Sequence, residues 1–107
     1  MFTIKIMNEF IHSPIWTYGE DGIVTDDLSI IENDSELQKL CDKVAEIYTG
    51  YYEFDSHGQA CWFNNEQEKA DKEIMLDLIQ RIRARLDEIN DGSFIVEDLE
   101  TQKLMSL

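Results

Sequence analysis

The first residues of the chain alternate between apolar and polar side chains. Residues 2–7 run Phe-Thr-Ile-Lys-Ile-Met, so every second side chain from Phe2 onward belongs to one apolar face. This period of two predicts a β-strand with one buried face. Ile15–Tyr18 and residues 23–25 are also β-prone, and the Gly-Glu-Asp-Gly segment between them predicts a hairpin. Residues 28–31 are a further candidate strand, although the helix that follows could include part of them.

Two longer segments carry apolar residues at helical spacing. Ser35 followed by Gln38 has the form of a capping box, and Gly50 supplies a stop, so we expect a helix over Ser35–Thr49. Asn65 followed by Glu68 predicts the start of a second, longer helix, which Gly92 ends. Its apolar stripe comprises Ile74, Leu78, Ile82, Leu86 and Ile89, widened by Met75 and Ile79.

A second hairpin is predicted from two aromatic-rich runs, residues 51–55 and 60–63. Glu53 and Asp55 would lie on its exposed face if Tyr52 and Phe54 point inward. Residues 93–96 predict a last strand, and the tail from 98 to 107 either frays or docks as a short turn of helix.

These elements predict an α+β fold in a single domain, residues 1–107. The order is strand, hairpin, helix, hairpin, helix, strand, with no linker or internal repeat. A two-layer sandwich satisfies the patterns: a mostly antiparallel sheet with two main helices packed on one face. The other face would be partly solvated and available to a partner. Because no long apolar run or secretory signal is evident, we expect a cytoplasmic protein.

Acidity is the strongest compositional signal. The chain has 23 Asp and Glu against 9 Lys and Arg, a formal net charge of −14. Solubility of a small domain needs only roughly 2 to 8 charges. The excess argues against direct contact with nucleic acid or an anionic membrane and favours a basic protein partner.

Candidate chemistry is sparse. Asp55, His57 and Cys61 cluster around the second hairpin but fall short of a metal site, and no nucleophile elbow or phosphate-binding loop is present. We read Cys41 and Cys61 as reduced core thiols. The sequence therefore predicts a protein that is not an enzyme and has no cofactor or metal.

The most informative stretch for binding joins two aromatic residues to four acids. Aromatic anchors beside charged residues are typical of interface hot spots. An equally good interpretation places Trp16 in the hydrophobic core. The predicted binding residues here are Trp16, Tyr18, Glu20, Asp21, Asp26 and Asp27, to which the hairpin adds Glu53 and Asp55.

Residues 1–7, Met-Phe-Thr-Ile-Lys-Ile-Met, together with residues 15–24, Ile-Trp-Thr-Tyr-Gly-Glu-Asp-Gly-Ile-Val, resemble the immunity proteins of bacterial contact-dependent growth inhibition systems. The resemblance implies a toxin inhibitor, or antitoxin. Such a protein binds the C-terminal toxin domain of its cognate effector, often a basic RNase acting on transfer RNA, and blocks its active site or an essential surface. In some of these systems the toxin also binds elongation factor Tu, so this chain would contact elongation factor Tu only indirectly, through the toxin.

Two alternatives from other classes stay open. One is a small acidic adaptor or regulatory subunit of a cytosolic complex. The other is an enzyme built on an acid pair that the sequence does not single out.

Overall fold

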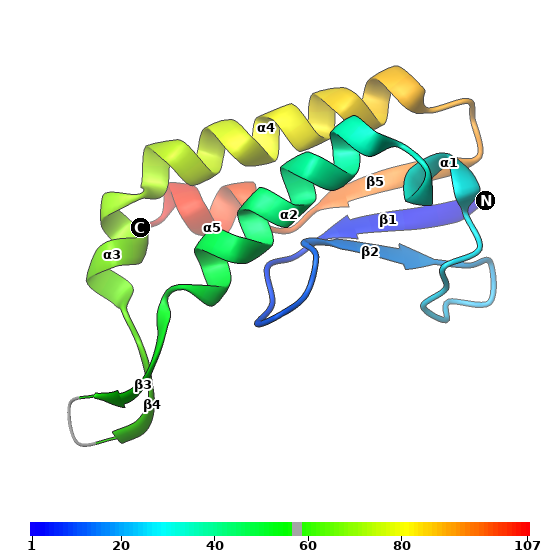
Figure 1. Cartoon of the computed structure of the whole chain (residues 1–107). Helices are drawn as coiled ribbons and strands as arrows, with labels where there is room; N and C mark the ends of the chain where they lie inside the picture. Colours follow the sequence, from blue (N-terminus) through cyan, green and yellow to red (C-terminus); the bar gives the residue numbers. More distant parts are fainter. Residues whose placement is uncertain (57–58) are drawn as a thin grey trace.

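A three-stranded sheet and a pair of long helices form the two layers of the molecule in the computed structural model (Figure 1). The structure describes residues 1–56 and 59–107, except for the side chains of residues 55, 56, 59 and 60. The predicted α+β class is confirmed, with a mixed sheet in place of a mostly antiparallel one.

The sheet has the order β2-β1-β5. The central strand β1, Phe2–Ile6, pairs antiparallel with β2, Ile15–Tyr18, and parallel with β5, Phe94–Asp98. Parallel pairing with the last strand needs a crossover, which the two helices provide. The first and last strands of the chain, β1 and β5, are therefore neighbours in the sheet, and the helices lie between them in the sequence.

The first predicted hairpin forms only in part. The chain returns along β2 after the turn, where Thr25 N–H donates to the Thr17 carbonyl at 2.9 Å and Gly19 N–H donates to the Ile23 carbonyl at 2.9 Å. Beyond these bonds there is a single bridge from Tyr18 to Val24, so residues 23–25 are not a strand.

The helical prediction over Ser35–Thr49 is confirmed as α2, which packs against α4, Lys72–Ile89. The candidate strand at residues 28–31 does not form, because Ser29–Glu32 is the short helix α1. The predicted single helix from Asn65 is also broken at Asp71. The piece before the break is α3, Asn65–Ala70.

Both predicted N-cap residues, Ser35 and Asn65, are one position late, although α2 and α3 begin at these residues. Asp34 caps α2 by accepting a hydrogen bond from Leu37 N–H at 2.8 Å, so the Ser35 capping box is wrong. Asn64 caps α3 in the same way through Gln67 N–H at 2.9 Å. Neither cap has helical backbone, and this lets the side chain turn back onto the first helical amides.

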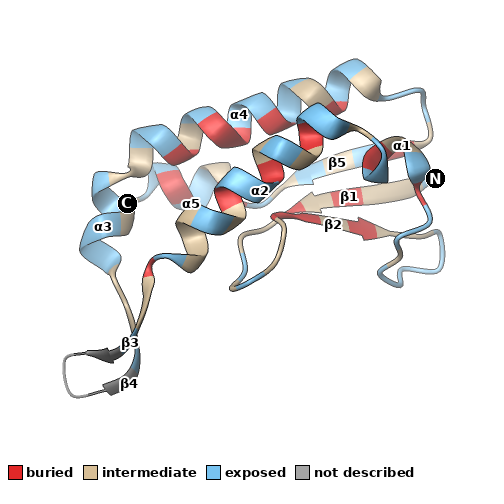
Figure 2. Cartoon of the chain, in the orientation of Figure 1, coloured by how far each residue is buried: buried red, intermediate tan, exposed pale blue. Residues whose placement is uncertain are grey.

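The core lies between the helix pair and one face of the sheet. Figure 2 shows the buried positions of α2 and α4 turned toward each other and toward the strands. Ile74 is an error in the predicted stripe, since it is 55% exposed. The tail docks through α5, Thr101–Met105, whose Leu104 is buried. The core side chains include Ile4, Ile6, Ile15, Leu37, Cys41, Val44, Met75, Leu78, Ile79, Ile82, Leu86 and Phe94.

The second predicted hairpin forms, from β3, Tyr52–Ser56, and β4, Gln59–Phe63. It is a separate sheet that projects from the body, so the expectation of one continuous sheet is wrong (Figure 1). Phe54 does not point into a core, because it is 58% exposed. The hairpin helps to make the molecule long, 48 × 26 × 24 Å, with a radius of gyration of 14.8 Å. A compact domain of this length would have about 13 Å.

Aromatic side chains anchor the projecting hairpin at its base. The ring of Tyr52 lies 5.0 Å from that of Phe63, and Tyr48 of α2 packs at 5.9 Å from Tyr52. From the loop before β2, Phe10 reaches Tyr52 with a centroid distance of 4.7 Å. Ring contacts of this kind hold the hairpin without a second core.

Candidate binding surface

None of the described helices covers the face of the sheet that points away from α2 and α4 (Figure 1). Pairing register and strand alternation assign its side chains. They are Thr3, Lys5, Trp16, Tyr18, Ile95 and Glu97. Ile95 is 49% exposed, and the two aromatic residues are half-buried. This face therefore combines apolar contact area with a solvent-accessible setting.

Trp16 and Tyr18 are held in defined positions on this face. The indole N–H of Trp16 donates to the Met7 carbonyl at 3.0 Å, and its ring stacks on His12 at 3.8 Å between centroids. Lys5 lies over the Tyr18 ring, with Nζ 4.9 Å from the centroid. Trp16 is thus neither a core residue nor a free side chain: it has fixed partners and keeps a solvent-accessible part.

Four of the predicted acids lie on one segment, residues 19–27, which we call the acidic loop. Glu20 pairs with the N-terminal ammonium group, which lowers the pKa of its carboxyl. Asp21 shapes the turn by accepting from Ile23 N–H at 3.0 Å. Asp26 and Asp27 are exposed, and neither carboxylate has an ion-pair partner among the described residues.

The two remaining predicted residues are not brought into this group. Glu53 lies on β3, half-buried, where it accepts a hydrogen bond from the Asn64 side chain at 2.9 Å. Asp55 belongs to the same strand, and its side chain lies outside the described residues. In Figure 1 the hairpin is at one end of the long axis and the acidic loop near the other. A single surface containing all eight residues does not form.

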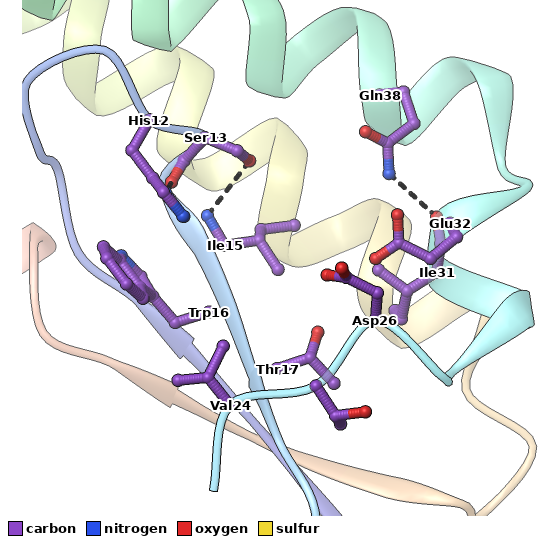
Figure 3. Close-up of a pocket in the computed structure, with 11 residues that line it drawn as sticks. His12, Ser13, Ile15, Trp16, Thr17, Val24, Asp26, Ile31, Glu32 and Gln38 are labelled. Atoms are coloured by element: carbon purple, nitrogen blue, oxygen red, sulfur yellow. Dashed lines mark hydrogen bonds between the residues drawn. The ribbon is translucent and has the colours of Figure 1, made fainter.

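A pocket of about 160 Å³ opens at the edge of β2, between the acidic loop, α1 and the start of α2 (Figure 3). Thr17 and Glu32, which line this pocket, are not among the binding residues predicted from the sequence. Thr17 is on the inward side of β2 and 5% exposed, and Glu32 ends α1. Asp26 of the acidic loop and Trp16 of β2 also line the pocket. A tertiary meeting of a strand, a loop and a helix leaves no short motif in the sequence.

The two thiols differ in setting. Cys41 is fully buried, as expected, and burial raises its pKa to about 12. The expectation for Cys61 is wrong, because it is exposed on the hairpin. Of the suggested metal cluster, His57 and the Asp55 side chain lie outside the described residues. Within the part of the chain that is described, no three His, Cys, Asp or Glu side chains are grouped to hold a metal.

Comparison of the chain with protein-family models, curated proteins and solved structures finds no match. Among the described helices, none has the length and apolar character needed to cross a membrane.

Proposed function

We propose that this chain is a cytoplasmic immunity protein that binds and neutralises a basic toxin domain, of the nuclease class. It does so by covering the active site of the toxin or another surface that the toxin needs. The proposal rests on one observation above all: a stretch of chain with acidic residues and no Lys or Arg carries two aromatic residues on the sheet face that the described helices leave uncovered.

Residues 6–38 contain eight Asp and Glu and no Lys or Arg. This stretch carries β2, the acidic loop and α1. Within this stretch Glu20 pairs with the N-terminal ammonium group, and Asp34 and Glu36 pair with Arg85. Three other acids have no ion-pair partner among the described residues: Asp26, Asp27 and Glu32. The negative field is therefore least compensated around β2, where a positively charged partner gains most from docking.

A nuclease binds phosphates in a cationic groove, and surface carboxylates can occupy that groove as nucleic acid would. Charge complementarity raises the association rate, while buried aromatic anchors slow dissociation. Trp16 and Tyr18 supply such anchors, and the acidic loop supplies the charge. This division of labour gives fast capture and a long-lived complex.

The direct test is coexpression with the product of the gene immediately upstream, which we expect to carry a basic toxin domain. We expect a stoichiometric complex in pull-down and restored growth of toxin-expressing cells. Absence of both would overturn the proposal. An acidic adaptor would copurify with an unrelated assembly and give no protection.

A charge-matched pair of variants tests whether the location of the acids matters. Each variant removes three exposed carboxylates, so the net charge changes equally. The first variant changes the acids near β2 and combines Asp26→Asn, Asp27→Asn and Glu32→Gln. The second is the control on the exposed sides of α2 and α4 and combines Asp42→Asn, Glu46→Gln and Asp87→Asn. We expect the first to slow association at least about tenfold and the second much less, with both effects shrinking as salt rises. Equal losses would mean that only total charge matters.

A further inference from the structure

The Thr17 side chain presents a hydroxyl that the fold leaves unused. Thr17 is 5% exposed, and its hydroxyl has no hydrogen-bond partner among the described residues. Figure 3 shows it directed into the pocket at the edge of β2, on the side of Asp26. The Thr17 hydroxyl is not among the fully buried polar atoms without a partner, so it is open to the pocket and can accept a hydrogen bond there. An incoming donor would complete this site.

The mouth of the same pocket is lined by two carboxylates, Asp26 from the acidic loop and Glu32 from α1 (Figure 3). Both are exposed, and neither has an ion-pair partner among the residues described. Thr17 and the two acids thus offer oxygen acceptors from three different elements. A group with several donors and positive charge fits this arrangement best.

We propose that the pocket receives the guanidinium group of one arginine side chain on the basic partner. This inference rests on the proposed function and names the chemistry by which the partner is gripped. Guanidinium has five N–H donors in a planar fork and no acceptor, so it reaches two carboxylates and a hydroxyl together. Trp16 also lines the pocket, with its ring stacked on His12 rather than on the two carboxylates (Figure 3).

The dimensions favour a single side chain over other occupants. At about 160 Å³ the pocket is smaller than the roughly 300–1,000 Å³ typical of small-molecule sites. A lysine ammonium is a compact point charge, which cannot serve three separated acceptors as well as a planar fork does. Arginine is also enriched at interface hot spots, whereas lysine is depleted.

The first experiment uses the full chain and two small probes, N-acetyl-L-arginine amide and its uncharged isostere N-acetyl-L-citrulline amide. We expect the arginine probe to shift the amide NMR signals of Thr17, Asp26 and Glu32 in a saturable way, with affinity on the order of 1 mM or weaker. The citrulline probe should leave them unchanged. Equal shifts from both probes, or equal shifts at Asp42 and Glu46, would overturn the proposal.

Thr17→Val tests the hydroxyl itself while keeping the side-chain shape. Because the hydroxyl has no hydrogen-bond partner among the described residues, this variant should unfold at the same temperature as the wild type or higher. It should nevertheless weaken the arginine probe severalfold. Reduced thermal stability together with unchanged probe affinity would show that Thr17 serves the fold alone, which contradicts the proposal.

The toxin complex separates this inference from the proposed function. Asp26→Asn with Glu32→Gln should weaken the complex at least about tenfold, against less than about threefold for Asp42→Asn with Glu46→Gln. If both doubles weaken it equally, the pocket inference fails and the proposed function stands. If no complex forms at all, the proposed function fails, and the probe titration decides the pocket alone.

Discussion

Arg85 of α4 grips Asp34, the residue that caps α2, at two points. Its Nε lies 3.0 Å from Oδ1 and its Nη2 lies 2.6 Å from Oδ2 of the same carboxylate. Oδ1 also accepts the N–H of Leu37 at 2.8 Å. One carboxylate therefore caps α2 and also links it to α4. A bidentate pair of this kind is the strongest form of an arginine–carboxylate contact.

Replacing Asp34 separates these two roles. Asp34→Ala should lower the free energy of unfolding by about 1 kcal/mol for the lost cap, and further for the lost pair. Asp34→Asn keeps a capping oxygen but loses the charge and one of the two oxygens that accept from Arg85, so it should be milder than Asp34→Ala. Urea denaturation of both variants measures the difference, and equal losses would mean that the cap contributes nothing.

The same carboxylate gives a pH dependence of known sign. The hydrogen bond from Arg85, followed by that from Leu37, lowers the pKa of Asp34 below its usual value. A lowered pKa stabilises the fold at every pH above the unfolded value of about 3.9, and this stability is lost as pH falls through the folded pKa. When the free energy of unfolding is measured at decreasing pH, the wild type should therefore lose more stability than Asp34→Asn.

Glu100 behaves in the opposite way. It is 5% exposed and accepts from Asn8 N–H at 2.8 Å, and burial raises its pKa. Burial and the nearby Glu100 likewise raise the pKa of Glu68. Within the described residues, Asn8 Oδ1 is buried without a partner. Lys103 Nζ is 3.7 Å from Glu100, at the exposed side, and is the cation facing it.

We therefore expect Glu100→Gln to stabilise the protein by about 1 kcal/mol near neutral pH, because the amide carries no ionisation cost and can donate to Asn8. The cost of ionising Glu100 appears as pH rises from the unfolded value of about 4.3 toward the raised folded value. The advantage of the variant should then vanish in more acidic solution. A destabilised variant at neutral pH would mean that the pair with Lys103 outweighs burial; exposed Glu66→Gln is the control.

Local patterns predicted the helices well and the pairings poorly. The spacing of apolar residues in Ser35–Thr49 fixes a helix, because only one stripe meets the core. Asp34 and Ser35 are both good caps, so neighbouring sequence cannot choose between them. The alternation in β1 likewise leaves its partner open, and the parallel neighbour β5 comes from the far end of the chain. The apolar Tyr52 and Phe54 are equally compatible with a core strand and with a projecting hairpin.

The candidate surface was predicted to the extent that it is contiguous in sequence. Trp16, Tyr18 and the acidic loop share one neighbourhood along the chain and also in space. Glu53 shares only its negative charge with these residues. It lies apart from them because its hairpin is a separate sheet. Thr17 looked like an ordinary strand residue, because its importance depends on the pocket that α1 closes.

The two cysteines should differ sharply in reactivity. Cys41 is fully buried with a pKa of about 12, whereas Cys61 is exposed. Since the thiolate is the reactive form, a disulfide reagent should titrate one thiol in the native protein and two in denaturant. Cys61→Ser should remove the native signal entirely. Two reactive thiols in the folded wild type would show that α2 opens readily.

Ile11 is held in a left-handed backbone conformation, with φ of 52° and a side chain 74% exposed. Such a conformation costs an L-residue roughly 1–2 kcal/mol, and asparagine tolerates it better. Its N–H donates to Thr49 Oγ1 at 3.0 Å, a bond that a side-chain change leaves in place. Ile11→Asn should raise the free energy of unfolding by about 0.5–1 kcal/mol. Ile23→Asn, 65% exposed and without positive φ, is the matched control and should give no gain; equal gains at both sites would assign the effect to surface polarity alone.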